Sequence, residues 1–196
     1  MTKVILHGGF TAAGNTSNDA FYGEFVRDIP DEGTILLVYF ASREEKEIPE
    51  KFRKHTARIQ AKSEGKNFDF VIATREGFIS QIEKSDAICF YGGSTSKLME
   101  ILKTYPDLKP LLAGKTVAGS SAGAYALARF GPSHHEENVR EGLGIVPVRV
   151  VCHYESSTLP PNEKAITMLQ NMAPEYELVL LRDFEWRVFL IASRNP

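Results

Sequence analysis

Short runs of apolar residues alternate with longer segments of helical periodicity along the whole chain. Runs of this length are typical of buried strands, and apolar residues spaced three or four positions apart are typical of amphipathic helices. The runs predict strands at Val4–Leu6, Ile35–Phe40, Phe68–Ala73, Ala87–Tyr91, Thr116–Ala118, Ile145–Cys152, Glu177–Leu181 and Val188–Ala192. The periodic segments predict helices at Asp19–Arg27, Pro49–Lys62, Glu76–Glu83, Ser96–Thr104, Ala122–Arg129 and Glu163–Asn171.

The alternation of strands and helices predicts a three-layer α/β/α sandwich around a mostly parallel sheet. A length of 196 residues fits a single domain spanning residues 1–196. The helix at Pro49–Lys62 is crowded with charged residues, so we expect it to lie mostly in solvent. The polar segment Gly131–Asn138 interrupts the pattern, and we expect it to form a surface loop near the functional site.

Composition excludes several classes of protein. Hydrophobic residues make up 43% of the chain and charged residues 24%, which is typical of a globular domain. The net charge of −2 offers no basic excess for nucleic acid, and no apolar run is long enough to cross a membrane. We therefore expect a cytoplasmic protein. Cys89 and Cys152 lie in apolar runs and are expected to be buried free thiols, and their spacing does not predict a zinc site.

The segment Gly119-Ser120-Ser121-Ala122-Gly123 lies between a predicted strand and an alanine-rich helix. A G-x-S-x-G motif in this context is typical of a nucleophile elbow, in which a tight turn projects the central serine from the sheet. Ser121 is then the candidate nucleophile, and the N–H of Ala122 is placed to donate to an oxyanion. The alternative is an ordinary turn in which Ser120 or Ser121 caps the helix.

A second glycine turn, Gly92-Gly93-Ser94, follows another predicted strand and should lie beside the elbow. The N–H of Gly93 is the candidate for a second oxyanion donor. An ordinary turn, with Ser94 or Ser96 as a helix cap, remains the alternative.

A serine nucleophile needs a general base, and the sequence contains five histidines. His153 follows the apolar run Ile145–Cys152, which should carry it to the edge where the elbow lies, so it is the preferred base. The alternatives are His134 and His135 in the polar loop. His55 is expected at the surface, and His7 either lines the pocket or is structural.

The base in turn needs a carboxylate to orient it. Asp183 follows the run Glu177–Leu181 and should reach the same edge. Glu185 is the close alternative acid, and Glu155 is a weaker one.

The segment Leu6-His7-Gly8-Gly9-Phe10 also looks like the oxyanion loop of α/β-hydrolase esterases. In those esterases the triad runs serine, acid, histidine, whereas no histidine follows His153 here. The esterase interpretation requires an acid from the polar loop: Glu136, Glu137 or Glu141.

Together these motifs resemble the dipeptidase E family of serine peptidases, the aspartyl dipeptidases, whose fold is related to class I glutamine amidotransferases. The resemblance covers nearly the whole chain and is carried by residues 6–9, 90–95, 119–124, 151–154 and 181–183. It implies Ser121 as nucleophile, His153 as base, Asp183 as the third member, and Gly93 and Ala122 as oxyanion donors.

Two positions depart from the family pattern, and both are expected to bind substrate. Ser94 stands where relatives have asparagine, and Asn162 stands where the aspartyl dipeptidases carry an arginine for the substrate's aspartate. Losing that cation should weaken a preference for N-terminal aspartate, because a charge-assisted hydrogen bond is lost. Arg149, Lys164 and Arg182 are candidate replacement cations.

The sequence therefore predicts a serine hydrolase that cleaves a short peptide, with Asp-Xaa dipeptides as one substrate class, through an acyl-enzyme. We expect no metal or cofactor, no nucleic-acid or membrane partner, and a monomer or homodimer. The alternatives are a non-catalytic binding module that keeps the elbow, and the esterase.

Overall fold

The structure is a computed structural model, and it describes residues 1–11, 16–133 and 136–192. Strands and helices alternate largely as predicted. The strands are β1 Thr2–His7, β2 Gly33–Val38, β3 Phe68–Ile72, β4 Ala87–Phe90, β5 Thr116–Ser120, β6 Ala128–Pro132, β7 Val139–Glu141, β8 Val146–Val151, β9 Glu177–Leu180 and β10 Trp186–Ile191. The helices are α1 Asp19–Val26, α2 Ile48–Ala61, α3 Phe78–Lys84, α4 Thr95–Leu102, α5 Ala122–Leu127 and α6 Glu163–Asn171, with 3₁₀ turns at Thr16–Asn18, Glu45–Glu47 and Pro110–Leu112.

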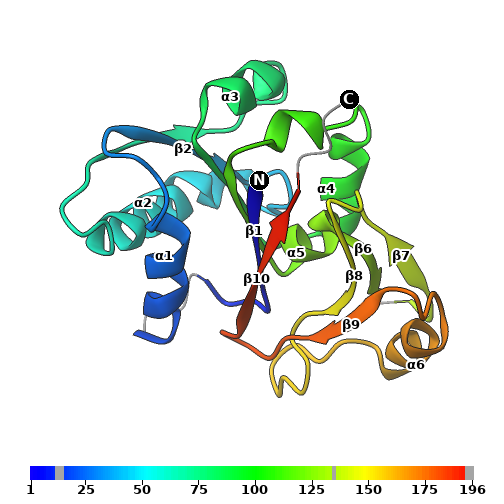
Figure 1. The fold of residues 1–196 in the computed structure, drawn as a ribbon. Coiled ribbons are helices and arrows are strands. Elements are labelled where there is room, and N and C mark those ends of the chain that lie inside the picture. The colour runs from blue at the N-terminus through cyan, green and yellow to red at the C-terminus, as the bar shows by residue number, and fades with distance from the viewer. Residues whose placement is uncertain (12–15, 134–135, 193–196) are drawn as a thin grey trace.

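The main sheet has six strands in the order β10-β1-β5-β4-β2-β3. Five of them are parallel, and β10 pairs antiparallel with β1 at one edge (Figure 1). The carboxyl ends of β1, β5, β4 and β2 therefore meet at one edge of the sheet, where the functional residues are expected.

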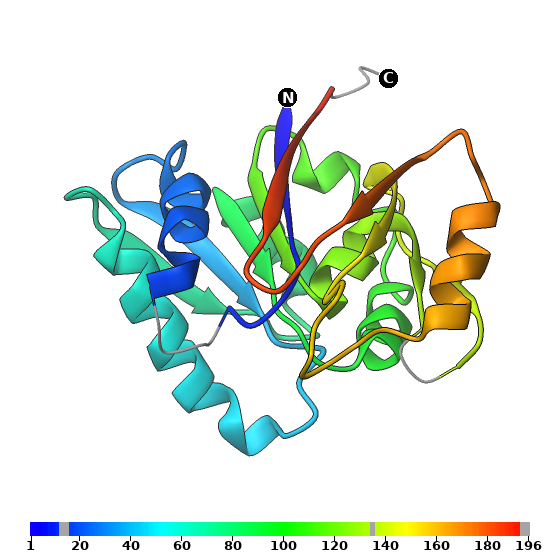
Figure 2. The same ribbon diagram turned by 90° about the horizontal axis from the view of Figure 1, so that it is seen from below.

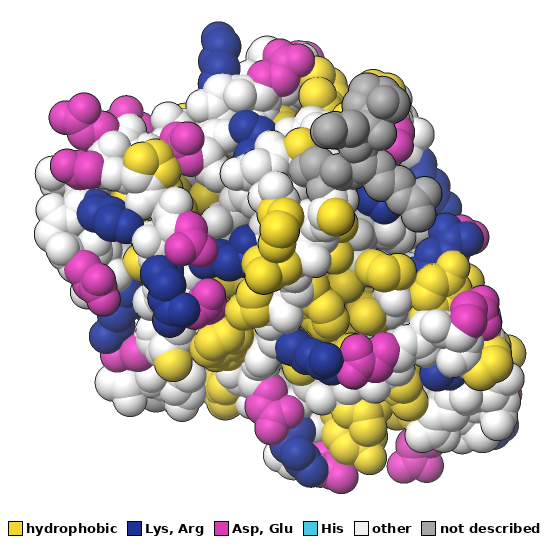
Figure 3. Space-filling model, in the orientation of Figure 1, with side chains coloured by type: hydrophobic (Ala, Val, Ile, Leu, Met, Phe, Trp, Pro, Cys, Tyr) yellow, Lys and Arg dark blue, Asp and Glu magenta, His cyan; other side chains and the backbone are white. Residues whose placement is uncertain are grey.

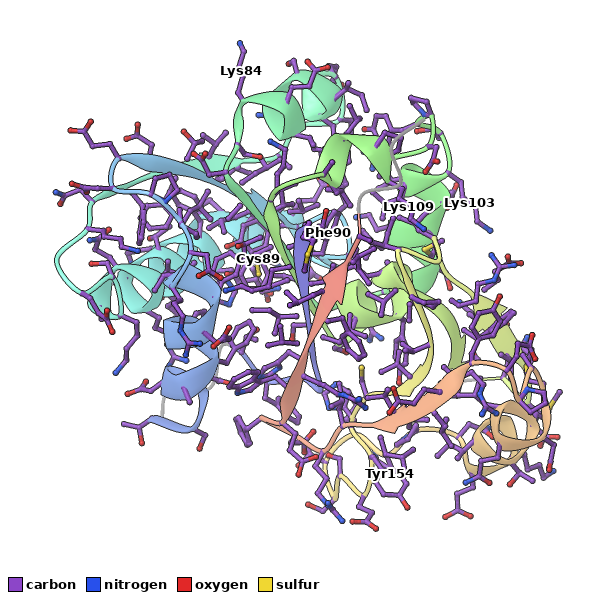
Figure 4. The ribbon with its side chains drawn as sticks, viewed as in Figure 1. Lys84, Cys89, Phe90, Lys103, Lys109 and Tyr154 are labelled. Atoms are coloured by element: carbon purple, nitrogen blue, oxygen red, sulfur yellow. The ribbon has the colours of Figure 1, made fainter. Side chains whose placement is uncertain are left out.

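Helices cover both faces of this sheet, because successive strand residues point to opposite sides. In β4, Cys89 packs in a core with Phe21 and Phe25 of α1, whereas Phe90 packs in a second core with Leu98 of α4. Cys89 and Phe90 lie at the centre of the molecule in Figure 4. These two cores confirm the predicted three-layer α/β/α arrangement.

A second sheet, in the order β7-β6-β8-β9, lies beside the main one. The sequence pattern predicts a single sheet, and this prediction was wrong, because four of the strands form a sheet of their own. The turn 181–185 joins the two sheets, because β9, which precedes it, belongs to the second sheet and β10, which follows it, belongs to the main one (Figure 1). Helix α6 packs on β6 and β7, at the far end of the molecule from α2 (Figure 2).

The prediction of a helix through Arg129 and of a loop from Gly131 was wrong at both boundaries. Helix α5 ends at Leu127, and Ala128 is already extended. Ala128 and Phe130 pair with β8, so strand pairing overrides the helical preference of alanine here. Gly131 and Pro132 belong to β6, and the remaining polar segment starts at Ser133.

Most of α2 is exposed or half-buried, as its charges predict, with His55 and Ile59 turned inward. Exposed apolar side chains gather over β10 and β9 in Figure 3, with Leu190 and Leu180 among them. In the described ranges no helix is long and apolar enough to cross a membrane. Both cysteines are buried free thiols.

Candidate active site

Ser121 is the single residue between β5 and α5. Its backbone lies at φ 51° and ψ −109°, a sparsely populated conformation that costs on the order of 1–3 kcal/mol. The turn closes tightly because Gly123 has no side chain: a Cβ there would lie 2.1 Å from the carbonyl oxygen of Phe90. The strand, the turn and the helix therefore form the elbow that the sequence predicts.

The side chain of Ser121 makes no cap hydrogen bond to α5, which argues against the interpretation of an ordinary helix cap. Its Oγ lies 3.0 Å from Nε2 of His153 instead. The side chain is only half-buried, so a substrate can reach the hydroxyl.

His153 and Asp183 come from the second sheet. They follow β8 and β9, which run parallel with Val151 opposite Leu180, so both chains leave the sheet at the same edge. Nδ1 of His153 lies 2.7 Å from Oδ1 of Asp183. The three side chains form a continuous path from the Ser121 hydroxyl to a carboxylate.

Ser156 completes the environment of Asp183. Its hydroxyl donates to Oδ2 of Asp183 at 2.6 Å and is itself buried. Oγ of Ser156 also accepts from the N–H of Leu159 at 3.1 Å, which fixes the serine in place. Ser156 was not predicted from the sequence, where only its closeness to His153 offered a signal.

The Gly8–Gly9 turn after β1 links the two sheets at the imidazole. The carbonyl of Gly8 accepts from the N–H of His153 at 3.1 Å. A Cβ on Gly9 would lie 2.0 Å from Cε1 of His153, so only glycine lets the turn approach the ring this closely. Phe10 packs edge-on against the same ring at a centroid distance of 5.0 Å. The imidazole is thus held on several sides.

Tyr125 of α5 ties the elbow to the strand that carries the base. Its hydroxyl accepts from the N–H of Cys152 at 3.0 Å and lies 3.2 Å from the carbonyl oxygen of the same residue. The positions of Ser121 and His153 are therefore linked through the buried hydrogen bonds of the Tyr125 hydroxyl to the backbone of Cys152, as well as through their own hydrogen bond.

His7 is a buried structural histidine beneath the Gly8–Gly9 turn. Its Nδ1 accepts from the N–H of Gly9 at 3.0 Å, so the proton lies on Nε2, which faces Oδ1 of Asn18 at 3.0 Å. Burial lowers the pKa of His7 to about 4 and keeps the ring neutral.

The esterase interpretation requires the same turn to supply oxyanion donors. The N–H of Gly8 donates to the carbonyl of Glu185, and that of Gly9 donates to His7. Because both amides are already used, the turn supports the base rather than an oxyanion.

The alternative acids do not contact the imidazole. Glu155 pairs with the guanidinium of Arg182, with a distance of 2.8 Å to Nε. Glu185 accepts from the N–H of Arg182 at 2.9 Å and lies 3.6 Å from its Nη1. Asp183 is therefore the carboxylate that the fold brings to His153.

The prediction that His55 lies at the surface was wrong. Its side chain is 3% exposed and stacks on Tyr91, with ring centroids 3.8 Å apart. It is buried because its position on α2 faces the sheet while its neighbours face solvent. The alternative bases His134 and His135 lie outside the described residues.

A groove opens on one side of Ser121. Gly93 and Ser94 line it, and in the described part of the chain the N–H groups of Gly93 and Ala122 make no hydrogen bond. Ser94 caps α4 by accepting from the N–H of Lys97 at 3.3 Å. The groove is also lined by Arg43, Thr95, Ser96, Pro132, Ser133, Arg140 and Leu159. Neither arginine was predicted as a site residue from the sequence, because the two come from segments far apart in the chain.

Asn162 and the candidate replacement cations Arg149 and Lys164 have other partners in the structure. Asn162 caps α6 by accepting from the N–H of Ala165 at 3.0 Å. Arg149 is buried and donates to backbone carbonyls around the end of α6, including those of Leu169 and Met172. Lys164 pairs with a glutamate at the surface.

No three His, Cys, Asp or Glu side chains among the described residues come together in a way that could hold a metal ion. The chemistry that the arrangement itself offers is acyl transfer, because it combines a hydroxyl, a base, an orienting carboxylate and the unused N–H groups of Gly93 and Ala122.

Comparisons with known proteins identify the family and the fold of the chain. The sequence profile of peptidase family S51 matches residues 5–189. A peptidase from an acI-B1 Actinobacterium has a similar structure, with a TM-score of 0.73 and 21% identity over 96% of this chain and 83% of that one. A peptidase E protein from Listeria monocytogenes EGD-e is similar with a TM-score of 0.65 and 18% identity, over 96% of this chain and 97% of that one.

No curated protein sequence gives a significant match. The solved structures establish the fold, which is the predicted class I glutamine amidotransferase-like one. The family match extends over nearly the whole chain, which therefore belongs to peptidase family S51 and is a serine-type peptidase of the dipeptidase E type.

Proposed function

We propose that the chain hydrolyses short peptides by transferring the acyl group to Ser121, with His153 as general base and Asp183 as the orienting carboxylate. The observation that carries this proposal is the path of two hydrogen bonds, 3.0 Å from Ser121 to His153 and 2.7 Å from His153 to Asp183.

In the first half of the reaction, Nε2 of His153 takes the proton from Oγ as the oxygen attacks the peptide carbonyl. The N–H groups of Gly93 and Ala122 donate to the oxyanion. His153 then gives the proton to the leaving amine. In the second half, water attacks the acyl-enzyme and the same base restores Ser121.

The acyl side of the substrate carries a negative charge in this proposal, as in Asp-Xaa dipeptides. Two cations support it: Arg43 and Arg140 line the groove that also contains Gly93 and Ser121. Arg140 is held by Glu136 at 3.1 Å, whereas no hydrogen bond or ion pair ties Arg43 to another described residue. Arg43 is therefore the better candidate to replace the family's arginine, whose matching position here is Asn162.

The test is mass-spectrometric hydrolysis of Asp-Ala, Asn-Ala and Ala-Ala by the wild type and by the variants Ser121→Ala, Arg43→Gln and Arg75→Gln. Arg75 is exposed and lines neither side of the site, so it is the matched control. The proposal requires that Ser121→Ala abolish cleavage and that Arg43→Gln alone reduce the preference for Asp-Ala over Asn-Ala. Cleavage that survives Ser121→Ala contradicts the mechanism. If neither the wild type nor the variants cleave any of the three dipeptides, the binding module is favoured instead.

A further inference from the structure

A second cavity, of about 210 Å³, opens on the other side of Ser121. Aromatic side chains form much of its wall: Phe10, Tyr39, His55 and Tyr91. Leu159 lines both this cavity and the groove, so the two spaces meet at the nucleophile. The mechanism proposed above leaves this cavity unassigned.

The aromatic wall is built by the main sheet and α2. Tyr39 follows β2 and Tyr91 follows β4, and the pairing of Val38 with Phe90 places the two tyrosines side by side. Their rings are 5.0 Å apart and inclined by 6°, and the ring of His55 lies parallel to Tyr91. All three rings are buried, so the wall is mostly aromatic surface.

Two buried polar atoms of this wall have no hydrogen-bond partner among the described residues: Nε2 of His55 and the hydroxyl of Tyr91. Nδ1 of His55 lies 3.0 Å from the hydroxyl of Tyr39. A buried polar atom left unpaired costs about 1–3 kcal/mol.

The position of His153 decides which part of a substrate the cavity faces. His153 lines the cavity, whereas Gly93, the proposed oxyanion donor, lines the groove. Nε2 of His153 must deliver its proton to the leaving amine, so the leaving residue lies on the side of His153. The cavity is therefore on the leaving-group side of Ser121.

The size of the cavity and the charge on its lining limit which group can occupy it. Pockets for drug-sized ligands measure roughly 300–1,000 Å³, so a space of about 210 Å³ suits one large side chain. Lys51 lies among the lining residues and is partly exposed, with its ammonium 2.9 Å from Glu47 and 3.3 Å from the hydroxyl of Ser42. In a dipeptide, a free carboxylate sits on the leaving residue, within reach of such a cation.

We infer that this cavity receives the leaving residue of a dipeptide, that this residue is aromatic, and that Lys51 binds its free carboxylate. The inference rests on the proposed function, since it takes Ser121 and His153 as the reacting pair. It adds a selectivity for the C-terminal residue that the acyl-side groove does not supply.

The first experiment measures kcat/KM for dipeptides that share the preferred acyl residue and end in Phe, Ala or phenylalaninamide. We expect the wild type to prefer Phe over Ala by about tenfold or more, because a filled apolar pocket discriminates on that scale. The amide should also be cleaved less well than the free acid. Equal rates for Phe and Ala would overturn the inference.

Lys51→Met and Lys54→Met form a matched pair on α2, because Lys54 is exposed and does not line the cavity. Lys51→Met should raise KM for the Phe dipeptide by about tenfold and remove the preference for the free acid over the amide. Lys54→Met should change neither. Retention of the full preference for the free acid in Lys51→Met would refute the assignment of the cation.

Calorimetric binding of L-phenylalanine to Ser121→Ala separates this inference from the proposed function, because it needs no hydrolysis. Binding that is weakened by adding Lys51→Met supports the cavity assignment even if no dipeptide is cleaved. Cleavage by the wild type without binding of L-phenylalanine, and without preference for Phe, contradicts the cavity assignment alone.

Discussion

The hydroxyl of Ser156 donates a 2.6 Å hydrogen bond to Oδ2 of Asp183, the carboxylate oxygen that His153 does not use. The carboxylate is therefore held from two sides, and its second oxygen is bound by an uncharged donor. This arrangement keeps the negative charge available to a developing imidazolium.

Replacing Ser156 by Ala should lower kcat by about 10–100-fold with little change in KM, because a hydrogen bond to a charged group is lost away from the substrate. Ser156→Thr keeps the hydroxyl and should recover most of the activity. Steady-state kinetics on one dipeptide checks both. An equal loss in Ala and Thr variants would point to a packing defect instead.

Asp183→Asn should reduce kcat by about 10⁴, since an amide favours the wrong tautomer of the base. Glu185→Gln and Glu155→Gln should each change kcat by less than about threefold, because their partner is the exposed Arg182. The three substitutions are matched in kind, so comparing them assigns the acid. A large loss in Glu185→Gln with a small one in Asp183→Asn would reverse the assignment.

Gly9→Ala should abolish most of the activity while the protein still folds, because the new Cβ would meet the ring of His153. Gly23→Ala is the control, since nothing lies within 4 Å of a Cβ at that position of α1. It should keep full activity and stabilise the helix by about 0.5–1 kcal/mol. Activity and circular dichroism of the two variants distinguish a local displacement of the base from loss of the fold. Wild-type activity in Gly9→Ala would contradict the close approach.

Acid should destabilise the protein through two buried histidines. Burial lowers the pKa of His7 to about 4 and that of His55 to about 3, from 6.5 in both cases. Below pH 6.5 the unfolded chain binds protons that the folded chain does not, so the free energy of unfolding falls as the pH decreases toward 4. Each histidine contributes up to about 1.4 kcal/mol per pH unit in this window.

The variant His55→Phe keeps an aromatic ring in the stack and removes one titrating group. Its free energy of unfolding should fall less steeply between pH 6 and pH 4 than that of the wild type, by about 1.4 kcal/mol per pH unit. Urea denaturation at several pH values measures both slopes. Equal slopes would show that His55 is accessible to protons in the folded state.

Local motifs made the elbow predictable from the sequence. The spacing of Gly119, Ser121 and Gly123 between a strand and a helix carries its own geometric requirement, and the structure has that turn. His153 and Asp183 were predictable for a related reason, because each lies within three residues of the end of an apolar strand and the ends of parallel strands converge.

Features that depend on pairing between distant segments were not predictable. The second sheet arises because Ala128–Pro132 pairs with β8, and nothing local distinguishes Ala128 and Arg129 from the end of a helix. The burial of His55 likewise depends on two tyrosines that precede and follow it in the chain by many residues. The approach of Gly9 to His153 joins residues of different sheets.

The most direct test of the account is covalent labelling with a fluorophosphonate, which reacts with an activated serine. Tryptic cleavage after Lys115 and Arg129 releases residues 116–129, a peptide that contains both Ser120 and Ser121. Fragmentation should place the label on Ser121, and labelling should be lost in His153→Ala but kept in Ser120→Ala. A label on any other residue, or an unlabelled protein that still cleaves dipeptides, would contradict Ser121 as the nucleophile.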